Sequence, residues 1–183
     1  MPVFIIIMGG VVPQKNTIFV TVLPSVDMKA KTAFLKMSEN ITYLLIVFVE
    51  GGANCGLPSR NNVIFKDINS IIKFDKLDFL AAARERYYCD FCYFGWINYD
   101  VLDFPRQMSL DLLGDRIIIK GCFSSSGSFI DDSTFIVPSD IIRDLPSGFT
   151  IQSLFEKRSE LFHRISVGNI YSGYLNSNIE VNL

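Results

Sequence analysis

The chain has 183 residues, of which 49% are hydrophobic and 20% charged, with a mean hydropathy of +0.31 and a formal net charge of −2. Disordered chains have the opposite composition, so these values exclude disorder and predict a packed core. The length suits one domain and no repeat or linker interrupts it, so we predict a single domain over residues 1–183.

The charges are unevenly distributed along the chain. Residues 1–95 carry ten basic and eight acidic side chains, whereas residues 96–144 carry four basic and eight acidic ones. No basic tail or stripe is present, which disfavours nucleic acid as a partner, because such binding neutralises many phosphates. No apolar run reaches the roughly 18–20 residues that span a bilayer, and four cysteines do not make a disulfide framework. We expect a cytoplasmic protein without a membrane partner.

The first half of the chain mixes strand and helix patterns. The expected strands are 3–12, with a hairpin turn at Gly9-Gly10, 17–23, 41–49 and 63–66. Ser25 is a candidate N-cap for a helix that continues to about Met37. Asp67 is expected to cap a helical turn, and Asp75 to cap a longer helix that ends near Cys89.

The second half contains the clearest hairpin and the clearest helix. The expected elements are a strand from about residue 93, a short helix at 109–113, a hairpin of 116–123 with 128–137, a short helix from Ser139 or Asp140 to Pro146, and a helix over 150–165 ended by Gly168. Strands outnumber long helices and do not alternate strictly with them. We therefore predict an α+β fold, with a mixed, mostly antiparallel sheet of about six to eight strands against three or four helices.

His163 is the only histidine, which excludes catalytic and metal sites that need two histidines from one chain. Its predicted place at the end of the helix 150–165 indicates a structural or surface role. Cys89 and Cys92 form a single CxxC, whereas a strong zinc signature has two such pairs. Surrounded by aromatic residues, the two cysteines are expected to be small buried hydrophobes, although metal binding and redox chemistry remain open alternatives.

The loop Gly51–Gly56 follows the most apolar strand but matches neither a Walker loop nor GxGxxG. Within it, Cys55 is a candidate nucleophile with His163 as its base. The aspartates of residues 96–144 could bind magnesium in principle, yet their spacing assembles no site. We therefore assign no catalytic residue, no metal and no cofactor.

An acidic block beside an excess of aromatic residues favours a binding surface, since interface cores are rich in aromatics and an acidic rim attracts a basic partner. The candidate partner-binding residues are Trp96, Tyr99, Asp100, Asp103, Asp131 and Asp132. This profile is that of small inhibitors such as immunity proteins. We predict a non-enzymatic binding protein, monomeric or homodimeric, that neutralises a basic protein partner such as a toxin or effector.

Two alternatives stay open. One is a small enzyme that uses Cys55 with His163, or a cluster of aspartates. The other is a self-associating structural protein or phage or viral accessory protein, pairing through an edge strand at residues 179–183.

Overall fold

The computed structural model describes residues 4–7, 10–13, 17–39, 41, 43–71, 75–101, 114–124, 127–146 and 148–166. Its strands are β1 (Phe4–Ile7), β2 (Gly10–Pro13), β3 (Thr17–Leu23), β4 (Leu44–Val49), β5 (Val63–Asp67), β6 (Tyr93–Ile97), β7 (Ile117–Ser124), β8 (Gly127–Pro138) and β9 (Phe162–Ser166). Its helices are α1 (Met28–Glu39), α2 (Lys76–Tyr87), α3 (Ser139–Asp144) and α4 (Ile151–Lys157), with short 3-10 turns η1 (Gly52–Asn54), η2 (Ile68–Ser70) and η4 (Ser159–Leu161).

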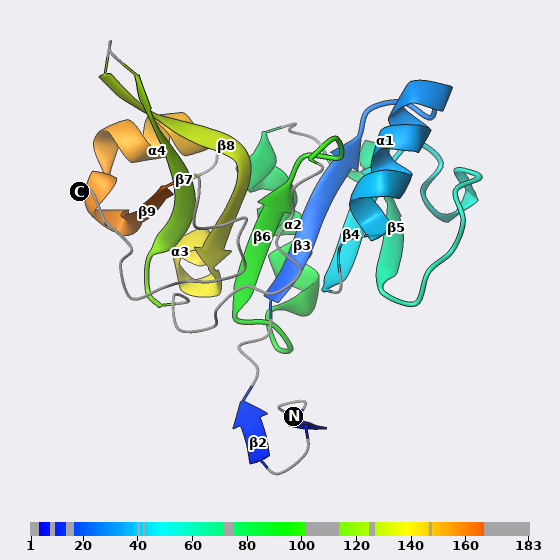
Figure 1. The fold of residues 1–183 in the computed structure, drawn as a ribbon, viewed down its shortest axis with the longest axis horizontal. Helices are drawn as coiled ribbons and strands as arrows, with labels where there is room; N and C mark the ends of the chain where they lie inside the picture. Colours follow the sequence, from blue (N-terminus) through cyan, green and yellow to red (C-terminus); the bar gives the residue numbers. More distant parts are fainter. Residues whose placement is uncertain are drawn as a thin grey trace.

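Seven of these strands form one mixed sheet in the order β5-β4-β3-β6-β8-β7-β9, and β1 pairs with β2 in a separate antiparallel ribbon. In the large sheet β8 is antiparallel to both of its neighbours. The other four pairings are parallel, which is a larger parallel share than the sequence suggested. The expected α+β fold with a mixed sheet and four helices is confirmed (Figure 1).

Helices pack on both faces of the large sheet. On one face, α2, α3 and α4 contribute side chains such as Leu80, Ile142 and Leu154 to a core with β3, β4, β6 and β8. On the other face, Phe34 and Met37 of α1 join a second core with the same central strands. Figure 1 shows α1 in front of the sheet and α2 behind it. Two cores require strands that are apolar on both faces, and β3 and β4 have that composition.

Several local signals in the sequence are confirmed. The side chain of Asp67 caps η2, and that of Asp75 caps α2 in a reciprocal capping box. The helix before β6 ends at Tyr87, and the β7–β8 hairpin lies where it was expected. The cap of α1 is different: Asp27, rather than Ser25, accepts the Ala30 N–H at 2.9 Å.

The predicted helix over 150–165 is wrong in its second half. Thr150 does cap α4, but that helix ends at Lys157, and Phe162–Ser166 forms β9 alongside β7. Phe162 is buried, and its ring packs edge-on against that of Phe155, with the ring centres 5.1 Å apart. The apolar residues that resembled a helical stripe instead serve a short helix and an edge strand, because Phe162–Ser166 pairs with β7, a partner far away in the sequence.

The predicted helix 109–113, the stop at Gly168 and the edge strand 179–183 lie outside the described residues. In the part of the chain that is described, no helix has both the length and the apolar character needed to cross a membrane.

The contact between β3 and β6 depends on a missing side chain. Gly95 lies opposite Phe19 in the parallel register, and a Cβ atom on Gly95 would lie 2.3 Å from the Phe19 ring. The ring is fully buried and cannot move aside. We therefore expect Gly95→Ala to lower the free energy of unfolding by about 1–3 kcal/mol, measured by urea denaturation.

Two further variants make this test specific. At Gly114 an added Cβ meets nothing within 4 Å, so Gly114→Ala should leave stability unchanged. Combining Gly95→Ala with Phe19→Leu should recover part of the loss, because the smaller side chain opens space. Additive effects of the two substitutions would contradict the proposed steric conflict.

Candidate functional site

The strand order reverses at β3. From β3 the chain proceeds to β4 and β5 on one side, then returns through α2 to β6 on the other side. The carboxyl ends of β3 and β6 therefore lie next to each other, while the connections that leave them go to opposite sides. Open sheets with parallel strands bind their ligands at such a switch point. We therefore take this edge of the sheet as the candidate functional site.

The turn that follows β6 is held from two sides. The Trp96 indole N–H donates to the Asn98 side-chain oxygen at 2.8 Å, and the Asn98 N–H donates to the Ser133 carbonyl at 2.9 Å. The Val101 N–H then donates to the Asn98 carbonyl at 3.1 Å and closes the turn. Asp100 lies within this turn and is exposed. In the described structure no hydrogen-bond donor or cation pairs with the Asp100 carboxylate.

An ion pair lies at the same edge of the sheet, next to β6 and β8. Lys76, the first residue of α2, donates to the Asp132 carbonyl at 2.8 Å and pairs with its carboxylate at 2.9 Å. The same ammonium lies 5.7 Å from the centre of the Trp96 ring. Asp131 accepts the Ser133 N–H at 2.9 Å. These contacts give Asp131 and Asp132 structural partners.

Asp75 is half-buried at the start of α2, beside this ion pair. Burial raises the pKa of its carboxyl above the ordinary value of 3.8, against the hydrogen bond from the Leu77 N–H, which lowers the pKa. The negative charges of Asp78 and Asp132 add to the increase. The cap of α2 is therefore a carboxylate whose charged form is disfavoured by its surroundings.

The connection from β3 to α1 ends at Asp27, which is exposed. The Ser25 hydroxyl donates to one oxygen of Asp27 at 2.5 Å, and the Ala30 N–H donates to the other. The hydrogen bond from Ser25, followed by that from Ala30, lowers the pKa of Asp27. Asp27 is thus the charged N-cap of α1, and each of its oxygens accepts a hydrogen bond.

The glycine-rich loop after β4 has a structural role. Gly52 is buried with a φ of 52°, and a Cβ there would lie 3.0 Å from the Asp67 backbone nitrogen, so glycine lets η1 pack against the end of β5. Cys55 is half-buried and packs against the core beneath α1.

The dyad of Cys55 and His163 is not formed. Cys55 follows β4, whereas His163 lies in β9 at the far edge of the sheet, five strand spacings from β4. At about 4.8 Å per spacing, the two positions are about 24 Å apart. The sequence had placed His163 at the end of a helix, but it belongs to the strand β9.

The predicted partner-binding residues separate into two groups. Trp96 is 5% exposed and belongs to the core with α2, so its predicted exposure is wrong. Tyr99 and Asp131 are half-buried, whereas Asp100 and Asp132 are exposed. Asp103 lies outside the described residues. Sequence reasoning missed Asn98 and Lys76, for which the only signals were the strand end and the helix start.

Cys89 and Cys92 are free and exposed, so the expectation that they are buried hydrophobes is wrong. Tyr87, Phe91 and Tyr93 pack partly against the cores, but Tyr88 is 56% exposed, and the connection that carries both thiols lies at the surface. Across the described residues, no three His, Cys, Asp or Glu side chains come close enough together to hold a metal ion.

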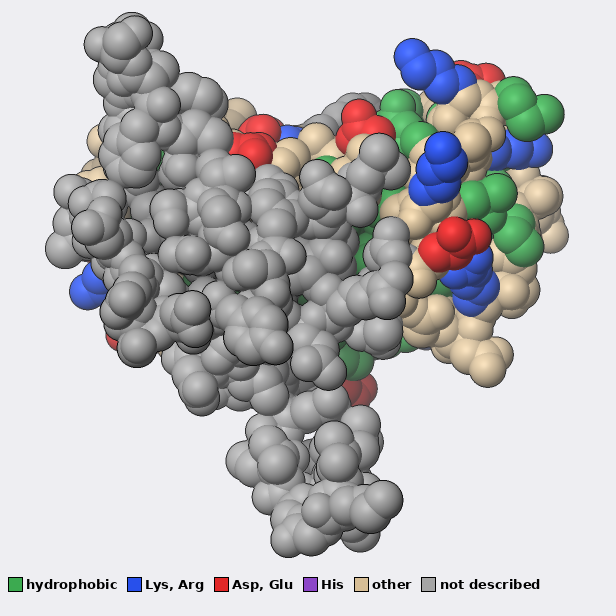
Figure 2. All heavy atoms as spheres, in the orientation of Figure 1, with side chains coloured by type: hydrophobic (Ala, Val, Ile, Leu, Met, Phe, Trp, Pro, Cys, Tyr) green, Lys and Arg blue, Asp and Glu red, His purple; other side chains and the backbone are tan. Residues whose placement is uncertain are grey.

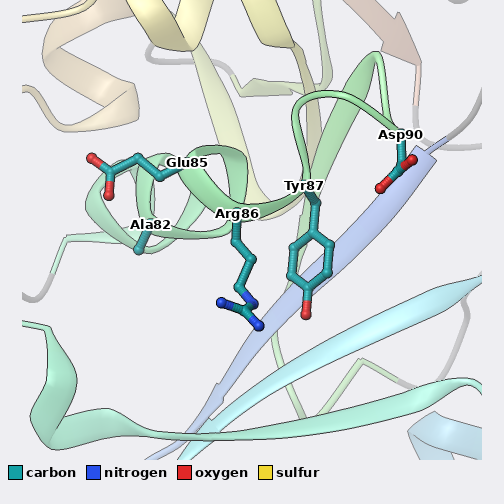
Figure 3. A pocket seen from close by; sticks show the side chains of 5 residues that line it. All are labelled: Ala82, Glu85, Arg86, Tyr87 and Asp90. Carbon is teal, nitrogen blue, oxygen red and sulfur yellow. The ribbon is translucent and has the colours of Figure 1, made fainter.

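A hollow lies beside the last turn of α2 and is lined by Ala82, Glu85, Arg86, Tyr87 and Asp90. Figure 3 shows Arg86 and Tyr87 pointing from the helix toward the strands, with Asp90 on the connection that follows. One cation between two carboxylates gives this hollow no clear preference for a charged ligand. It is also open and shallow, which makes it a weaker candidate than the switch point.

The fold resembles two solved structures at very low sequence identity. The manganese complex of Rv0371c from Mycobacterium tuberculosis H37Rv aligns with a TM-score of 0.50 and 10% identity, over 84% of this chain and 88% of that chain. The 4-diphosphocytidyl-2C-methyl-D-erythritol synthase from Anaerococcus prevotii DSM 20548 aligns with a TM-score of 0.51 and 6% identity, over 88% of this chain and 92% of that one. No protein-family model and no curated protein sequence matches the chain.

These likenesses overturn the prediction of a non-enzymatic inhibitor or immunity-like protein. The fold is one that a synthase uses, over nearly the whole length of both chains. The excess of aromatic residues had suggested an interface, but the sheet has a core on each face and absorbs them: Phe19, Phe34, Phe94 and Phe135 are all at most 2% exposed.

The raised pKa of Asp75 predicts how stability depends on pH. Between the unfolded value near 3.8 and the raised folded value, the folded chain holds the proton that the unfolded chain has lost. Stability attributable to Asp75 therefore falls as the pH rises through this interval. In Asp75→Asn the side chain still caps α2 without titrating, so this fall should be absent from its unfolding profile.

Asp75→Ala separates the cap from the charge. It should lose about 1 kcal/mol at neutral pH because the Leu77 N–H loses its acceptor, whereas Asp75→Asn should match or exceed the wild-type stability there. Urea denaturation from pH 3 to pH 7 measures both effects, with the pH range set about the ordinary carboxyl value. Parallel profiles for Asp75→Asn and wild type would assign the pH dependence to other groups.

Proposed function

We propose that this chain is an enzyme that acts on a phosphorylated substrate of the nucleotide class, bound at the carboxyl ends of β3 and β6. The observation that carries the proposal is Asp100, an exposed carboxylate without a protein partner in the described structure, on a turn held rigidly at the switch point. Preorganised polar groups on rigid elements are what a binding site requires.

The comparison supports the substrate class. The synthase that shares the fold is named for a diphosphocytidyl product, and its likeness extends over both halves of the sheet. Fold likeness alone does not assign a reaction. It is the coincidence of that fold with an available carboxylate at the ligand-binding edge that favours an enzyme of this kind.

The surroundings of the β3–α1 connection also suit phosphate. α1 has no acidic residue in its first turn and carries Lys29, Lys31 and Lys36. Figure 2 shows basic side chains over α1. The positive charge of Lys29 contributes to the lowered pKa of Asp27. A phosphate group close to the start of α1 would meet the three lysines of this helix as well as the negatively charged cap Asp27, whose carboxylate accepts hydrogen bonds from Ser25 and Ala30.

A single carboxylate such as Asp100 cannot hold a metal ion by itself, but it can bind a metal ion that substrate phosphates also bind. The described residues offer no cluster for a cation held by protein alone. Mg²⁺ and Mn²⁺, however, are often bound through one or two carboxylates together with substrate phosphates. Asp100 would hold such a cation, which would neutralise phosphate charge. Trp96, Asn98 and Ser133 would keep the turn that carries Asp100 in place.

The proposal predicts that Asp100→Asn weakens nucleotide binding at least about tenfold, as expected when a charged contact is lost. Titration calorimetry of the wild-type chain with the four common nucleoside triphosphates in Mg²⁺ or Mn²⁺ should identify a nucleotide that binds. The same titrations in a chelator should show weaker binding. Turnover of that nucleotide is then followed by its phosphorus NMR signals in the presence of cell metabolites.

Asp140→Asn is the matched control, because Asp140 is exposed at the opposite edge of the sheet and Arg143 keeps its second partner, Asp144. It should bind like wild type, and Asp100→Asn should unfold like wild type. Failure of every nucleotide to bind the wild-type chain would refute the substrate class. Equal binding by Asp100→Asn and wild type would refute the role of Asp100.

A further inference from the structure

The connection from α2 to β6 brings two thiols to the surface at a point where the chain reverses. Cys89 lies two residues after the end of α2, and Cys92 immediately precedes β6. The Asp90 and Phe91 N–H groups both donate to the Tyr87 carbonyl, at 3.1 and 3.0 Å, so the chain turns back directly after the helix.

Both arms of this reversal are anchored. Arg84 in the last turn of α2 donates through Nε to the Ser139 carbonyl and hydroxyl at 2.8 and 2.9 Å. The Cys92 carbonyl accepts the Ser139 N–H at 2.8 Å. The helix and the strand are therefore tied to the same residue of α3, and the two cysteines lie between fixed ends.

The spacing suits a disulfide. The two cysteines have the CxxC spacing of dithiol–disulfide sites, and a disulfide forms where the Cα atoms can approach within about 6.8 Å. Both sulfur atoms are free and exposed, so a soluble reagent can reach them. Cys55, in contrast, is half-buried in the core beneath α1.

Tyr88 and Arg84 are the polar neighbours of Cys89. A hydrogen bond with Cys89 raises the pKa of Tyr88, so the phenol keeps its proton beside the sulfur. Arg84 lies over the Tyr88 ring at 5.5 Å and places a positive charge nearby.

We propose that Cys89 and Cys92 are a reversible thiol-modification site that closes into an intramolecular disulfide by exchange with a low-molecular-weight disulfide such as glutathione disulfide. This site is separate from the switch point and does not depend on the proposed nucleotide chemistry. A metal site is disfavoured there, because no third His, Cys, Asp or Glu among the described residues completes a ligand set.

The exchange proceeds in two balanced steps. The thiolate of one cysteine attacks a sulfur of glutathione disulfide, forms a mixed disulfide and releases one glutathione thiolate. The second cysteine gives its proton to solvent and attacks the protein sulfur of that mixed disulfide, which forms the Cys89–Cys92 bond and releases the second glutathione. Two protein thiols are oxidised, and one glutathione disulfide is reduced to two glutathione molecules.

The test uses the full chain in buffers of reduced and oxidised glutathione, followed by acid quenching, alkylation and tryptic mapping. Cleavage after Arg86 and Arg106 gives one peptide that contains Cys89 and Cys92 but neither Cys55 nor Cys122. In oxidising buffer this peptide should lose two hydrogen atoms and take up no alkylating reagent, while the Cys55 peptide remains alkylated. Reduced glutathione should reverse the change.

The matched variants are Cys89→Ser and Cys92→Ser. In each, the remaining cysteine has no partner and should carry a glutathione adduct or stay alkylated. The proposal is overturned if the wild-type peptide remains fully alkylated in oxidising buffer, or if it accumulates two glutathione adducts instead of the internal bond. Peptides linked between two chains in place of the internal bond would also overturn it.

Discussion

The arrangement of this molecule depends on β3 having a parallel neighbour on each side. β3 has β4 on one side and β6 on the other. As a parallel strand in the middle of the sheet, it is stable only if other elements cover both of its faces. That requirement explains why the chain carries two separate cores, and why α1 lies on one face while α2 lies on the other. It also explains the contact at Gly95, where the Phe19 ring occupies the space that a side chain would need.

The same pairing creates the candidate site. Because β3 and β6 run in the same direction, their carboxyl ends meet at one edge, and the turn after β6 is presented beside the start of α1. Trp96 lies in the core and reaches Asn98 through its indole N–H, so a buried side chain fixes the position of an exposed turn. Rigidity at the surface thus originates in the packing beneath it.

Local features of the fold could be predicted from the sequence, and its long-range order could not. The caps at Asp67 and Asp75 and the β7–β8 hairpin rest on interactions within a few residues, which the sequence displays directly. The strand β9 was missed because its apolar residues continue the period of α4, and only the presence of β7 beside it selects the strand. The order of seven strands likewise depends on contacts between distant residues.

The candidate site, like the fold, could be predicted from the sequence only in part. Composition pointed to residues 96–144, and Asp100 lies in that block, but nothing in the sequence distinguished Asp100 from its acidic neighbours or revealed that Trp96 is buried. The exposure of Cys89 and Cys92 was hidden for a related reason: their aromatic neighbours are apolar, and sequence patterns cannot tell which side of a turn enters the core.

What distinguishes the carboxylates around the switch point is the use that the fold makes of each. Asp27 and Asp75 cap helices, and Asp132 holds Lys76 against Trp96. Substituting any of these changes folding as well as surface charge, so a loss of ligand binding there would be ambiguous. Asp100 makes no such contact within the described structure. Loss of its carboxylate can therefore be interpreted as the loss of a ligand contact, because the turn that presents it is maintained by Trp96, Asn98 and Ser133.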